Sequence, residues 1–551
     1  MTRRESILLT LLFIVYALLL FYHIGDYPVW NKDEGLYAET VREMIERGNF
    51  LDPYFNYEHR WQKPVLIYWV LLPFSYLWGA NAFTLRLALV CLSLATLLVT
   101  WLFAKRLFRN EQIAFLSAFF LVSSASFILQ ARHIVTHMLL LFTVMLSFIF
   151  LYDLLRGKRD PKTVFLFGAS VGLAFLAKLY VGVVFILTTG FLLGAGEICR
   201  HKAAFVKRSL YALLGFALVG LPWYLYMLSR YGDAYVVFLY HEFFDRIGKN
   251  VTGKNSPFFY LKVFFGNFAP WSILLLVLAL LYLKRFWGTI WETLEKNREL
   301  LLVLTAFFVV FITLSIPKSK LPPYLFYLQG FAAILTALAV YHASMNRLLR
   351  YTIYGIQGLL SVALIAIWIL YFDYRSLVFF AIAAVTAALW FLKMENIYLG
   401  IFRIGVVMLM LYFTVLGNIF DTIQPFFGYQ RFGEKIVKIH RHEPKLKFYS
   451  LRKMRTSLPF YAQCKVRNVE KLPQENHYIL LTSVEDFKPY AKRYRYRVLD
   501  RSLFYKRSDS RVWQMLNILK GYRRNDSSRT GELLLLEIEG KRSEGPSTVN
   551  R

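Results

Sequence analysis

Long apolar runs separated by short polar intervals extend from the start of this chain to about residue 420. Runs long enough to cross a bilayer as helices lie near 6–24, 83–104, 113–130, 137–155, 163–177, 180–197, 209–228, 270–284, 299–316, 323–342, 351–371, 376–392 and 397–418. This pattern predicts an α-helical polytopic membrane protein with about 13 transmembrane helices. A further run at 64–80 is only marginally long enough to cross.

The charge in the loops decides the placement of the run at 64–80. If this run stays on one side, the basic loops near 105–109, 156–162, 200–208, 284–298 and 347–350 all face the cytoplasm, as the positive-inside rule requires. If it crosses, all of them face outward. We therefore predict an interfacial or re-entrant helix at 64–80 and a cytoplasmic N-terminus. The polar segments 25–82, 229–269 and 317–323 are then expected on the outer face.

The character of the chain changes after Gln424. Alternating polar and apolar positions predict short strands near 447–450, 478–482, 497–507 and 533–538, with a helical stretch near 484–494. Residues 1–420 are predicted to form the transmembrane domain. Residues 421–551 are predicted to form a small soluble α/β domain on the outer face, with a frayed C-terminus from about Arg523.

Composition agrees with the membrane class, since 57% of the residues are hydrophobic and 18% are aromatic. Basic cytoplasmic loops and anionic membrane lipids account for the net charge of +30. No RNA-binding signature or zinc spacing indicates a nucleic-acid partner. The three cysteines are scattered and form neither a disulfide framework nor a metal cluster. No cofactor is predicted, and the sequence does not support a divalent cation.

The first outer segment is rich in charged residues. Its residues 31–48 predict a surface helix with one apolar face that includes Tyr37. Asn31 and Glu34 have capping-box spacing. Asp33, at the start of this helix, has two interpretations of equal weight. It either caps the helix or directs a carboxylate towards a substrate.

Basic residues on the outer face are the second group of candidates. Lys63 is either a snorkelling membrane anchor or a point charge for a lipid-linked phosphate. Lys178 interrupts an apolar stretch, where an ionisable residue indicates function. Arg246 either pairs with Glu242 at i,i+4 spacing or binds a phosphate through its guanidinium. The segment 317–324 is a further basic hairpin between spans.

Ordered motifs between about 30 and 325 carry a resemblance to a known family. They are Asp33-Glu34-x-x-Tyr37-Ala38-Glu39, Lys63-Pro64, Gly79-x-x-x-Phe83-x-x-Arg86, Lys178, Leu221-Pro222-Trp223, Glu242 with Arg246, Pro257-Phe258-x-Tyr260, Pro270-Trp271 and Ser315-x-x-Lys318-x-Lys320-Leu321-Pro322-x-Tyr324. The set resembles the GT-C fold glycosyltransferases that use polyprenyl-phosphate sugars, in particular the ArnT (lipid A aminoarabinose transferase) and protein O-mannosyltransferase-like family.

The resemblance implies a site and its partners. Asp33 is implied as the central catalytic carboxylate, and a polyprenyl-phosphate-linked sugar as the donor. Lipid A, lipopolysaccharide or a protein is implied as the acceptor. The residues expected to bind the donor phosphate or substrate are Glu34, Tyr37, Lys63, Lys178, Arg246, Lys318, Lys320 and Tyr324.

Two positions depart from the family pattern. The family's second aspartate falls where this chain has the segment 132–137, so that His137 replaces it by position or His133 serves from one turn away. The glutamate that precedes Lys-Pro in the family is Gln62. We take His137 as a second candidate catalytic residue. The alternative is that it is a polar residue at a helix start.

Together these features predict an inner-membrane glycosyltransferase. It would move a sugar from an undecaprenyl-phosphate-type carrier to lipid A or the lipopolysaccharide core on the periplasmic face. One alternative is a protein O-glycosyltransferase that uses the same class of donor. Another is a non-catalytic lipid-binding or transport protein, although transporters place paired polar residues at mid-bilayer between internal repeats, and no repeat is evident in the sequence.

Overall fold

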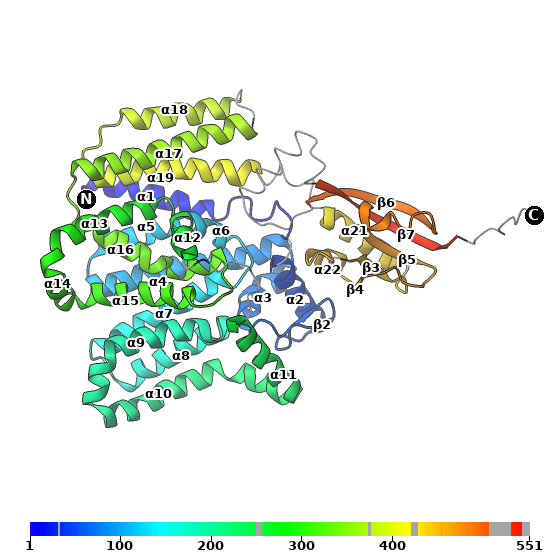
Figure 1. The fold of residues 1–551 in the computed structure, drawn as a ribbon, viewed down its shortest axis with the longest axis horizontal. Helices are drawn as coiled ribbons and strands as arrows, with labels where there is room; N and C mark the ends of the chain where they lie inside the picture. The colour runs from blue at the N-terminus through cyan, green and yellow to red at the C-terminus, as the bar shows by residue number, and fades with distance from the viewer. Residues whose placement is uncertain are drawn as a thin grey trace, which may run out of the picture.

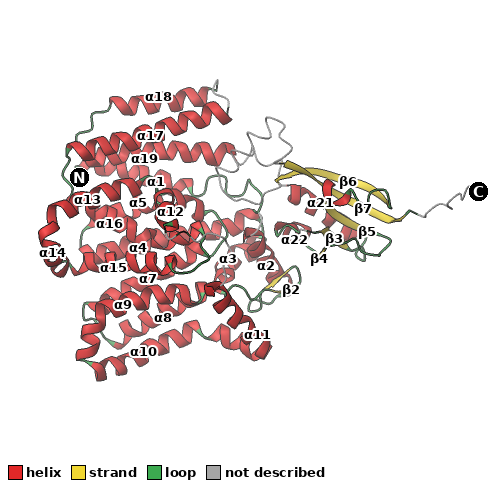
Figure 2. Cartoon of the chain, in the orientation of Figure 1, coloured by secondary structure: helices red, strands yellow, loops and turns green. Residues whose placement is uncertain are grey.

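In a computed structural model, the structure describes residues 1–30, 33–248, 256, 258–372, 376–419, 428–452, 454–505 and 530–542. A body of long, roughly aligned helices bears a small β-sheet at one end (Figure 1, Figure 2). In the first half of the body the helices are α1 (Arg3–Leu19), α2 (Asp33–Arg47), α3 (Leu66–Trp78), α4 (Ala82–Phe108), α5 (Glu111–Val122), α6 (Ala125–Ala131), α7 (His137–Leu155), α8 (Pro161–Lys178), α9 (Tyr180–Arg200) and α10 (Lys202–Gly220).

The second half of the body is built in the same way. Its helices are α11 (Pro222–Gly248), α12 (Phe259–Asn267), α13 (Trp271–Phe286), α14 (Ile290–Lys296), α15 (Arg298–Ser315), α16 (Gln329–His342), α17 (Arg347–Tyr371), α18 (Leu377–Phe391) and α19 (Ile397–Thr414). Short segments of other helix types are η1 (Trp287–Thr289), η2 (Pro322–Leu328) and η3 (Val415–Ile419).

The described residues contain 10 helices that are long and apolar enough to cross a membrane, or up to 11 if one bent pair is a single span. These agree with 11 of the predicted runs. The other two, at 6–24 and 376–392, fall on α1 and α18, which are 17 and 15 residues long. The predicted fold class, a polytopic helical membrane protein with a small C-terminal sheet unit, is confirmed.

The outer surface of the helical body is apolar, as contact with lipid requires. Only 11% of the apolar stretch of α10 is buried inside the body. Large side chains such as Leu213 and Leu218 on this helix, and Leu359 and Val362 on α17, are exposed. A water-soluble protein rarely exposes such extended apolar surfaces. The chain is therefore a multi-span membrane protein.

The run at 64–80 forms the short helix α3. At about 1.5 Å per residue, its 13 residues reach about two thirds of the hydrocarbon thickness of a bilayer. Aromatic side chains including Trp69, Tyr76 and Trp78 are exposed on it, and such side chains favour the head-group layer. These features fit the predicted interfacial helix.

Two predicted spans are interrupted. The run at 113–130 is bent by 70° between α5 and α6, where the side chains of Ser123 and Ser124 hydrogen-bond back to carbonyls of the preceding turn. The run at 209–228 ends at Gly220, because a new helix begins with Pro222. The segment 229–269, which is expected on the outer face, contains the end of α11 up to Gly248 and the helix α12.

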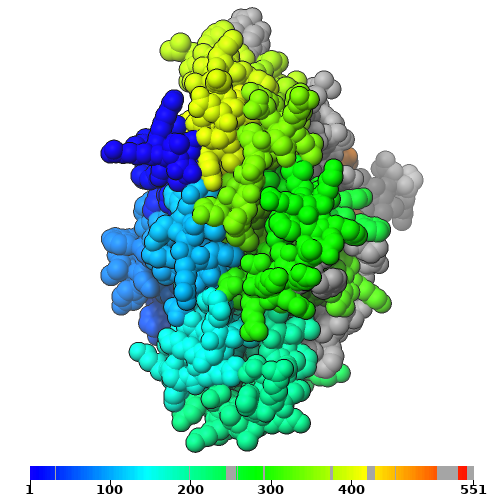
Figure 3. Space-filling model, turned by 90° about the vertical axis from the view of Figure 1, so that its left-hand side faces the viewer, coloured from blue at the N-terminus to red at the C-terminus, as the bar shows by residue number. Residues whose placement is uncertain are grey.

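The polar elements gather at the two ends of the helical body. The sheet, α2, α3 and the end of α11 lie at one end, and α14 and the junction of α9 with α10 lie at the other (Figure 1). Figure 3 looks onto the end without the sheet, where helices from several parts of the chain meet. There Arg106 binds Asp153 through two nitrogens at 2.7 and 2.6 Å, linking α4 to α7.

The C-terminal unit is a mixed five-stranded sheet with the order β4-β3-β5-β7-β6. Its elements are α21 (Gly428–His442), β3 (Phe448–Leu451), α22 (Ser457–Ala462), β4 (Val466–Val469), β5 (Tyr478–Ser483), α23 (Val484–Phe487), β6 (Tyr494–Tyr505) and β7 (Thr530–Lys541). β3 pairs in parallel with β4 and β5, and β7 runs antiparallel between β5 and β6. A small hairpin of β1 (Tyr54–Phe55) and β2 (Glu58–His59) lies in the first outer segment.

All four predicted strands of the tail are present. The predicted helix at 484–494 is only four residues long in the structure. The prediction of a frayed end from Arg523 was wrong for Thr530–Lys541, because this segment is a strand paired on both sides. Its leucines at alternate positions face two separate apolar clusters, one on each face of the sheet.

The close contact of α8 with α10 gives a first test of the fold. A methyl group at Gly168 would overlap the backbone of Ala212, so Gly168→Ala is expected to force these helices apart and to lower the free energy of unfolding by about 1–3 kcal/mol. A methyl group at Gly196 of α9 would meet nothing within 4 Å. Gly196→Ala is therefore the control, expected to leave stability unchanged or to raise it by up to ~1 kcal/mol.

Thermal unfolding of both variants in the same detergent measures the difference. Equal melting temperatures for the two variants would contradict the close approach of α8 and α10.

Candidate functional site

The site is built around a buried ion pair between α2 and α4. Glu34 is 1% exposed, and its Oε2 accepts from Nη2 of Arg86 at 2.8 Å and from the backbone N–H of Trp30 at 2.7 Å. Its Oε1 accepts from the backbone N–H of Ile134 at 3.0 Å, and Nδ1 of His133 lies 3.3 Å away. Arg86 also donates to carbonyls of the segment 24–28 at 2.7–2.9 Å. One carboxylate therefore joins three segments that are far apart in sequence.

The charge state of Glu34 follows from these contacts. Burial by itself raises the pKa of its carboxyl, but the Arg86 charge and the His133 contact outweigh burial and hold the pKa far below its usual range. The contacts occupy both oxygens. They give Glu34 an architectural role, and the direct substrate contact expected from sequence remains a prediction.

Asp33 differs from its neighbour in every respect. Its side chain is exposed at the first position of α2, and it makes no hydrogen bond or ion pair with the part of the chain that the structure describes. Tyr37 and Arg60 lie within its electrostatic reach. Of the two interpretations left open by sequence, this geometry favours a carboxylate available to a substrate.

Behind Asp33 lies a layer of aromatic and basic side chains. The guanidinium of Arg60 lies 5.2 Å from the ring centroid of Tyr37, and its Nε donates to the hydroxyl of Tyr68 at 2.9 Å. The Tyr37 side chain is buried and also lies against Thr136. Burial and the neighbouring Tyr68 raise the pKa of the Tyr37 hydroxyl, which keeps it neutral. Since Thr136 precedes His137, this layer connects Asp33 to the second candidate residue.

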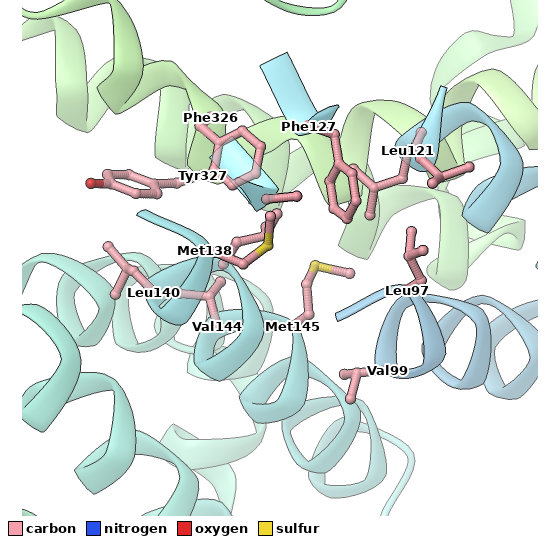
Figure 4. Packing of buried hydrophobic residues seen from close by; sticks show 14 of the residues in the cluster. Leu97, Val99, Leu121, Phe127, Met138, Leu140, Val144, Met145, Phe326 and Tyr327 are labelled. Carbon is pink, nitrogen blue, oxygen red and sulfur yellow. The ribbon is translucent and has the colours of Figure 1, made fainter. Parts of the chain in front are cut away.

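His137, Tyr327 and Lys178 form a connected chain of polar atoms. Nδ1 of His137 lies 2.6 Å from the hydroxyl oxygen of Tyr327, and the ammonium of Lys178 donates to that same oxygen. Nζ of Lys178 also lies 4.3 Å from the ring centroid of Tyr324. Figure 4 shows the Tyr327 ring beside Phe326, with its hydroxyl directed away from the apolar cluster. The prediction that Lys178 lies at the site is supported by this chain of contacts.

A pocket that opens to solvent lies next to this chain and is lined in part by Lys178. Its lining brings together Lys63 and Lys178, which are 115 positions apart in sequence, with Gln62 and Glu242. The turn between α8 and α9 supplies the remaining wall, where Leu179 adopts a left-handed φ of 50°. This strained turn directs Lys178 into the pocket instead of along the helix.

The basic hairpin approaches from the opposite side. Lys318 is exposed, whereas Lys320 is 4% exposed. α12 anchors the hairpin, because the Tyr260 hydroxyl accepts from the N–H of Leu321 at 3.3 Å and Asn267 donates to the carbonyl of Pro322 at 2.9 Å. The 3₁₀ turns of η2 then place Tyr324 and Tyr327 on the same side, with ring centroids 6.5 Å apart.

The sheet unit packs directly on the helix that carries Asp33. The Tyr461 hydroxyl of α22 accepts from the backbone N–H of Val29 at 2.6 Å. A Cβ on Gly35 would lie 2.5 Å from the backbone of Ser457. Asn56 exchanges two 2.8 Å hydrogen bonds with the backbone of Val466, the first residue of β4. The sheet unit therefore forms part of the scaffold of the site.

Sequence reasoning found most of these residues but not all. Arg246 belongs to α11, and its side chain lies outside the described part of the chain. Arg60 and Tyr327 were missed. Arg60 lies three residues before Lys63 in a segment already expected outside the membrane, and Tyr327 follows Tyr324 by one 3₁₀ turn.

Among the described residues, no group of three or more His, Cys, Asp or Glu side chains is placed to hold a metal ion. The described groups of the site include the carboxylate of Asp33, the lysines Lys63 and Lys178, the His137–Tyr327 pair and Arg60.

Comparison with known proteins identifies the fold that holds these groups. Residues 6–238 match the dolichyl-phosphate-mannose-protein mannosyltransferase (PMT) family. This match covers less than half of the chain. Its structure resembles that of ArnT from Cupriavidus metallidurans bound to undecaprenyl phosphate, with a TM-score of 0.71 at 19% identity over 95% of this chain and 97% of that chain.

Similarity to curated proteins extends over about two thirds of this chain. A protein of Aquifex aeolicus described as uncharacterized is 28% identical over 67% of this chain and 71% of its own length. An undecaprenyl phosphate-alpha-4-amino-4-deoxy-L-arabinose arabinosyl transferase of Proteus mirabilis is 25% identical over 65% of this chain, and this chain spans 63% of that relative. The predicted GT-C fold and glycosyltransferase class are confirmed by these similarities.

The buried ion pair between Glu34 and Arg86 can be tested directly. Glu34→Gln leaves the buried Arg86 without its counter-charge and is expected to lower the free energy of unfolding by about 3–5 kcal/mol. The folded pKa of Glu34 is depressed, so its contribution is complete above the unfolded value of about 4.3 and is lost as pH falls through the folded value. The difference in free energy of unfolding between Glu34→Gln and the unsubstituted protein should therefore be constant between roughly pH 6 and 8, well above the unfolded pKa. It should become smaller only at strongly acidic pH.

Thermal unfolding at several pH values checks this, with the exposed Glu46→Gln on the same helix as control. An equal loss in both variants would contradict the architectural role of Glu34.

Proposed function

We propose that this chain transfers a sugar from an undecaprenyl-phosphate-type carrier to lipid A or the lipopolysaccharide core. The observation that carries the proposal is the pocket in which Lys63 and Lys178 meet beside the His137–Tyr327 pair, at the end of the body that also presents Asp33. Support comes from the ArnT crystal structure with undecaprenyl phosphate, whose fold this chain shares.

The two lysines suit the phosphate of the carrier. An ammonium group is a compact point charge that binds phosphate oxygens without a fixed approach direction. During transfer, negative charge grows on the leaving phosphate, and cations already in place stabilise it in the transition state. Arg246 and the hairpin lysines Lys318 and Lys320 remain predicted contributors on the same ligand.

The reaction is a displacement at the anomeric carbon. An acceptor oxygen forms a bond to this carbon while the bond to the carrier phosphate breaks, and its electron pair leaves with the phosphate. If the acceptor is a hydroxyl, Asp33 takes its proton as general base. If the acceptor is a phosphate of lipid A, it is already ionised, and Asp33 orients the sugar instead. An exposed carboxylate without a protein partner suits either role.

His137 fits a role that an aspartate could not fill. The ammonium of Lys178 donates to the Tyr327 oxygen, and all three groups are satisfied when the Tyr327 hydroxyl donates a hydrogen bond to Nδ1 of His137. The remaining proton of the neutral imidazole then lies on Nε2, where it serves as a hydrogen-bond donor. We infer that His137 donates to a substrate oxygen, with Asp33 as the acting carboxylate.

The proposed cellular placement follows from charge. The basic loops lie at the end of the body opposite to the site, and the positive-inside rule puts that end in the cytoplasm. The site and the sheet unit then face the periplasm from the inner membrane. A free lipopolysaccharide precursor is accessible on that face.

Mass spectrometry of lipid A from cells with and without the gene tests the proposal. We expect an added sugar mass that is present with the unsubstituted chain and lost with Asp33→Asn. Removal of a general base or an orienting carboxylate costs roughly 100-fold or more in rate. Asp26→Asn, an exposed acid paired with His23 near the same end, is the control expected to retain the modification.

Two outcomes would overturn the assignment. Unchanged lipid A together with altered periplasmic glycoproteins would establish the protein O-glycosyltransferase alternative, which the PMT match makes the next candidate. Full activity of folded Asp33→Asn protein would remove Asp33 from the mechanism.

Cysteine labelling tests the orientation. Cys91, Cys199 and Cys464 are first replaced, and a single cysteine is then introduced at Glu58, 74% exposed in the first outer segment, or at Lys158, 59% exposed in a basic loop. A membrane-impermeant maleimide is expected to label Glu58→Cys in spheroplasts of intact inner membrane. It should label Lys158→Cys only after permeabilisation. The reverse pattern would invert the topology.

A further inference from the structure

We propose that Arg60 is a separate anion-binding group of the site, which binds a carboxylate or phosphate of one of the two substrates beside Asp33. This inference rests on the proposed function and adds to it the class of chemical group that the substrate must carry.

Arg60 is held firmly in one orientation. Its backbone N–H donates to the carbonyl of Pro53 at 2.8 Å. Its side chain is fixed by the Nε bond to Tyr68 and by the Tyr37 ring beneath the guanidinium, and the residue is 6% exposed. The two tyrosine rings themselves pack at 5.9 Å. A guanidinium that is already ordered loses little entropy when it binds a ligand.

The terminal nitrogens of Arg60 are available. A guanidinium has five N–H donors, and in the part of the chain that the structure describes only the Nε donor has a protein acceptor. Neither terminal nitrogen is among the sealed polar atoms that lack a partner, so both remain open to solvent. The four N–H groups of these two nitrogens form a planar fork that has no acceptor among the described residues. This is the geometry that binds carboxylate or phosphate oxygens in pairs.

The buried Arg132 and Arg403 also lack a carboxylate partner among the described residues, but each donates to a backbone carbonyl through a terminal nitrogen, which Arg60 does not. Two arginines closer to the site, Arg86 and the half-buried Arg42, do have carboxylate partners. Arg86 pairs with Glu34 at 2.8 Å, and Arg42 pairs with Glu39 at 2.7 Å. Arg60 has no carboxylate within 4.0 Å among the described residues. A buried cation without a counter-charge is costly, and a ligand anion removes that cost when it binds.

Asp33 lies near Arg60 without pairing with it. It is within electrostatic reach of Arg60, yet the two side chains do not form an ion pair. In the proposed complex, the ligand group lies between this acid and this base. A ligand placed there accepts from Arg60 through an anionic oxygen and presents a hydroxyl or sugar to Asp33.

The group on Arg60 is distinct from the carrier phosphate. The pocket that holds Lys63 and Lys178 is not lined by Arg60. Two sources supply the required chemistry. One is a carboxylate on the donor sugar, and the other is a phosphate on the acceptor.

Kinetics with matched substrates tests the inference. The purified full chain is assayed with a polyprenyl-phosphate hexose or the corresponding uronic acid as donor, and with bisphosphorylated or monophosphorylated lipid A as acceptor. Arg60→Gln is expected to raise the KM for the substrate that carries the recognised anion by roughly tenfold to hundredfold, the usual effect of losing a charge-assisted hydrogen bond. Its kcat, and the KM for the partner lacking that anion, should be unchanged.

Two variants control for structure. Arg60→Lys keeps the charge but loses the fork, and is expected to restore part of the affinity. Arg495→Gln removes an exposed arginine of β6 that has no ion pair among the described residues, and should behave as the unsubstituted chain.

The outcomes separate this inference from the proposed function. A uniform loss with every substrate pair, or no change with any, would overturn the role of Arg60 while leaving the transfer reaction intact. Absence of transfer by the unsubstituted chain would overturn the proposed function itself. Native mass spectrometry then tests, without turnover, whether Arg60 binds a phosphate of the acceptor. It compares the binding of bis- and monophosphorylated lipid A to the unsubstituted and Arg60→Gln chains. Equal retention of both lipids by the two chains would exclude an acceptor phosphate as the bound group.

Discussion

The ion pair of Glu34 with Arg86 is the interaction on which the site depends. It fixes the first turn of α2 against α4, and through the N–H of Ile134 it also fixes the segment that ends at His137. Removing two charges from water costs several kcal/mol per ion. Here the cost is offset because both partners bind further backbone groups, so nearly every donor and acceptor is used. Asp33 and Glu34, adjacent in sequence, therefore divide their work. The Glu34 carboxylate is hydrogen-bonded within the protein through both oxygens, and the Asp33 carboxylate has no partner among the described residues.

Irregular backbone supplies the rest of the site. The 70° break between α5 and α6 leads to His137, the left-handed turn at Leu179 presents Lys178, and the 3₁₀ segment η2 presents Tyr327. Non-helical backbone at a membrane is tolerated where protein or a water-filled cavity satisfies its polar groups. The coincidence of three such irregularities around one pocket indicates a shared purpose. Regular helices would have directed these side chains into lipid or into the apolar core.

The limits of prediction from the sequence follow the same division. Apolar run lengths predicted the spans and the short helix at 64–80, because those signals are local. The outer position of Lys63 and Lys178, which rests on loop charges, remains a prediction. The role of Glu34 was not predictable, since its partners Arg86 and Ile134 lie 52 and 100 positions away. Arg60 was missed for a related reason, because its identity as a buried and unpaired cation exists only once Tyr37 and Tyr68 enclose it. The strand predicted at 533–538 is longer in the structure, because pairing with β5 and β6 orders the whole of Thr530–Lys541, in a region also expected to be frayed.

The sheet unit belongs to the same argument. Its contacts with the first outer segment are not those of a tethered domain, since Gly35 leaves no space for a side chain beneath Ser457 and Asn56 continues the edge of β4. The Tyr461 hydroxyl binds the backbone at Val29, just before the turn that leads to Asp33. Any displacement of the sheet unit would therefore shift the start of α2, and with it the free carboxylate and the buried Glu34. The position of Asp33 is thus determined from two sides, by an ion pair inside the membrane body and by a packed sheet outside it. A carboxylate without a protein partner of its own can act on a substrate only if its helix is held in this way.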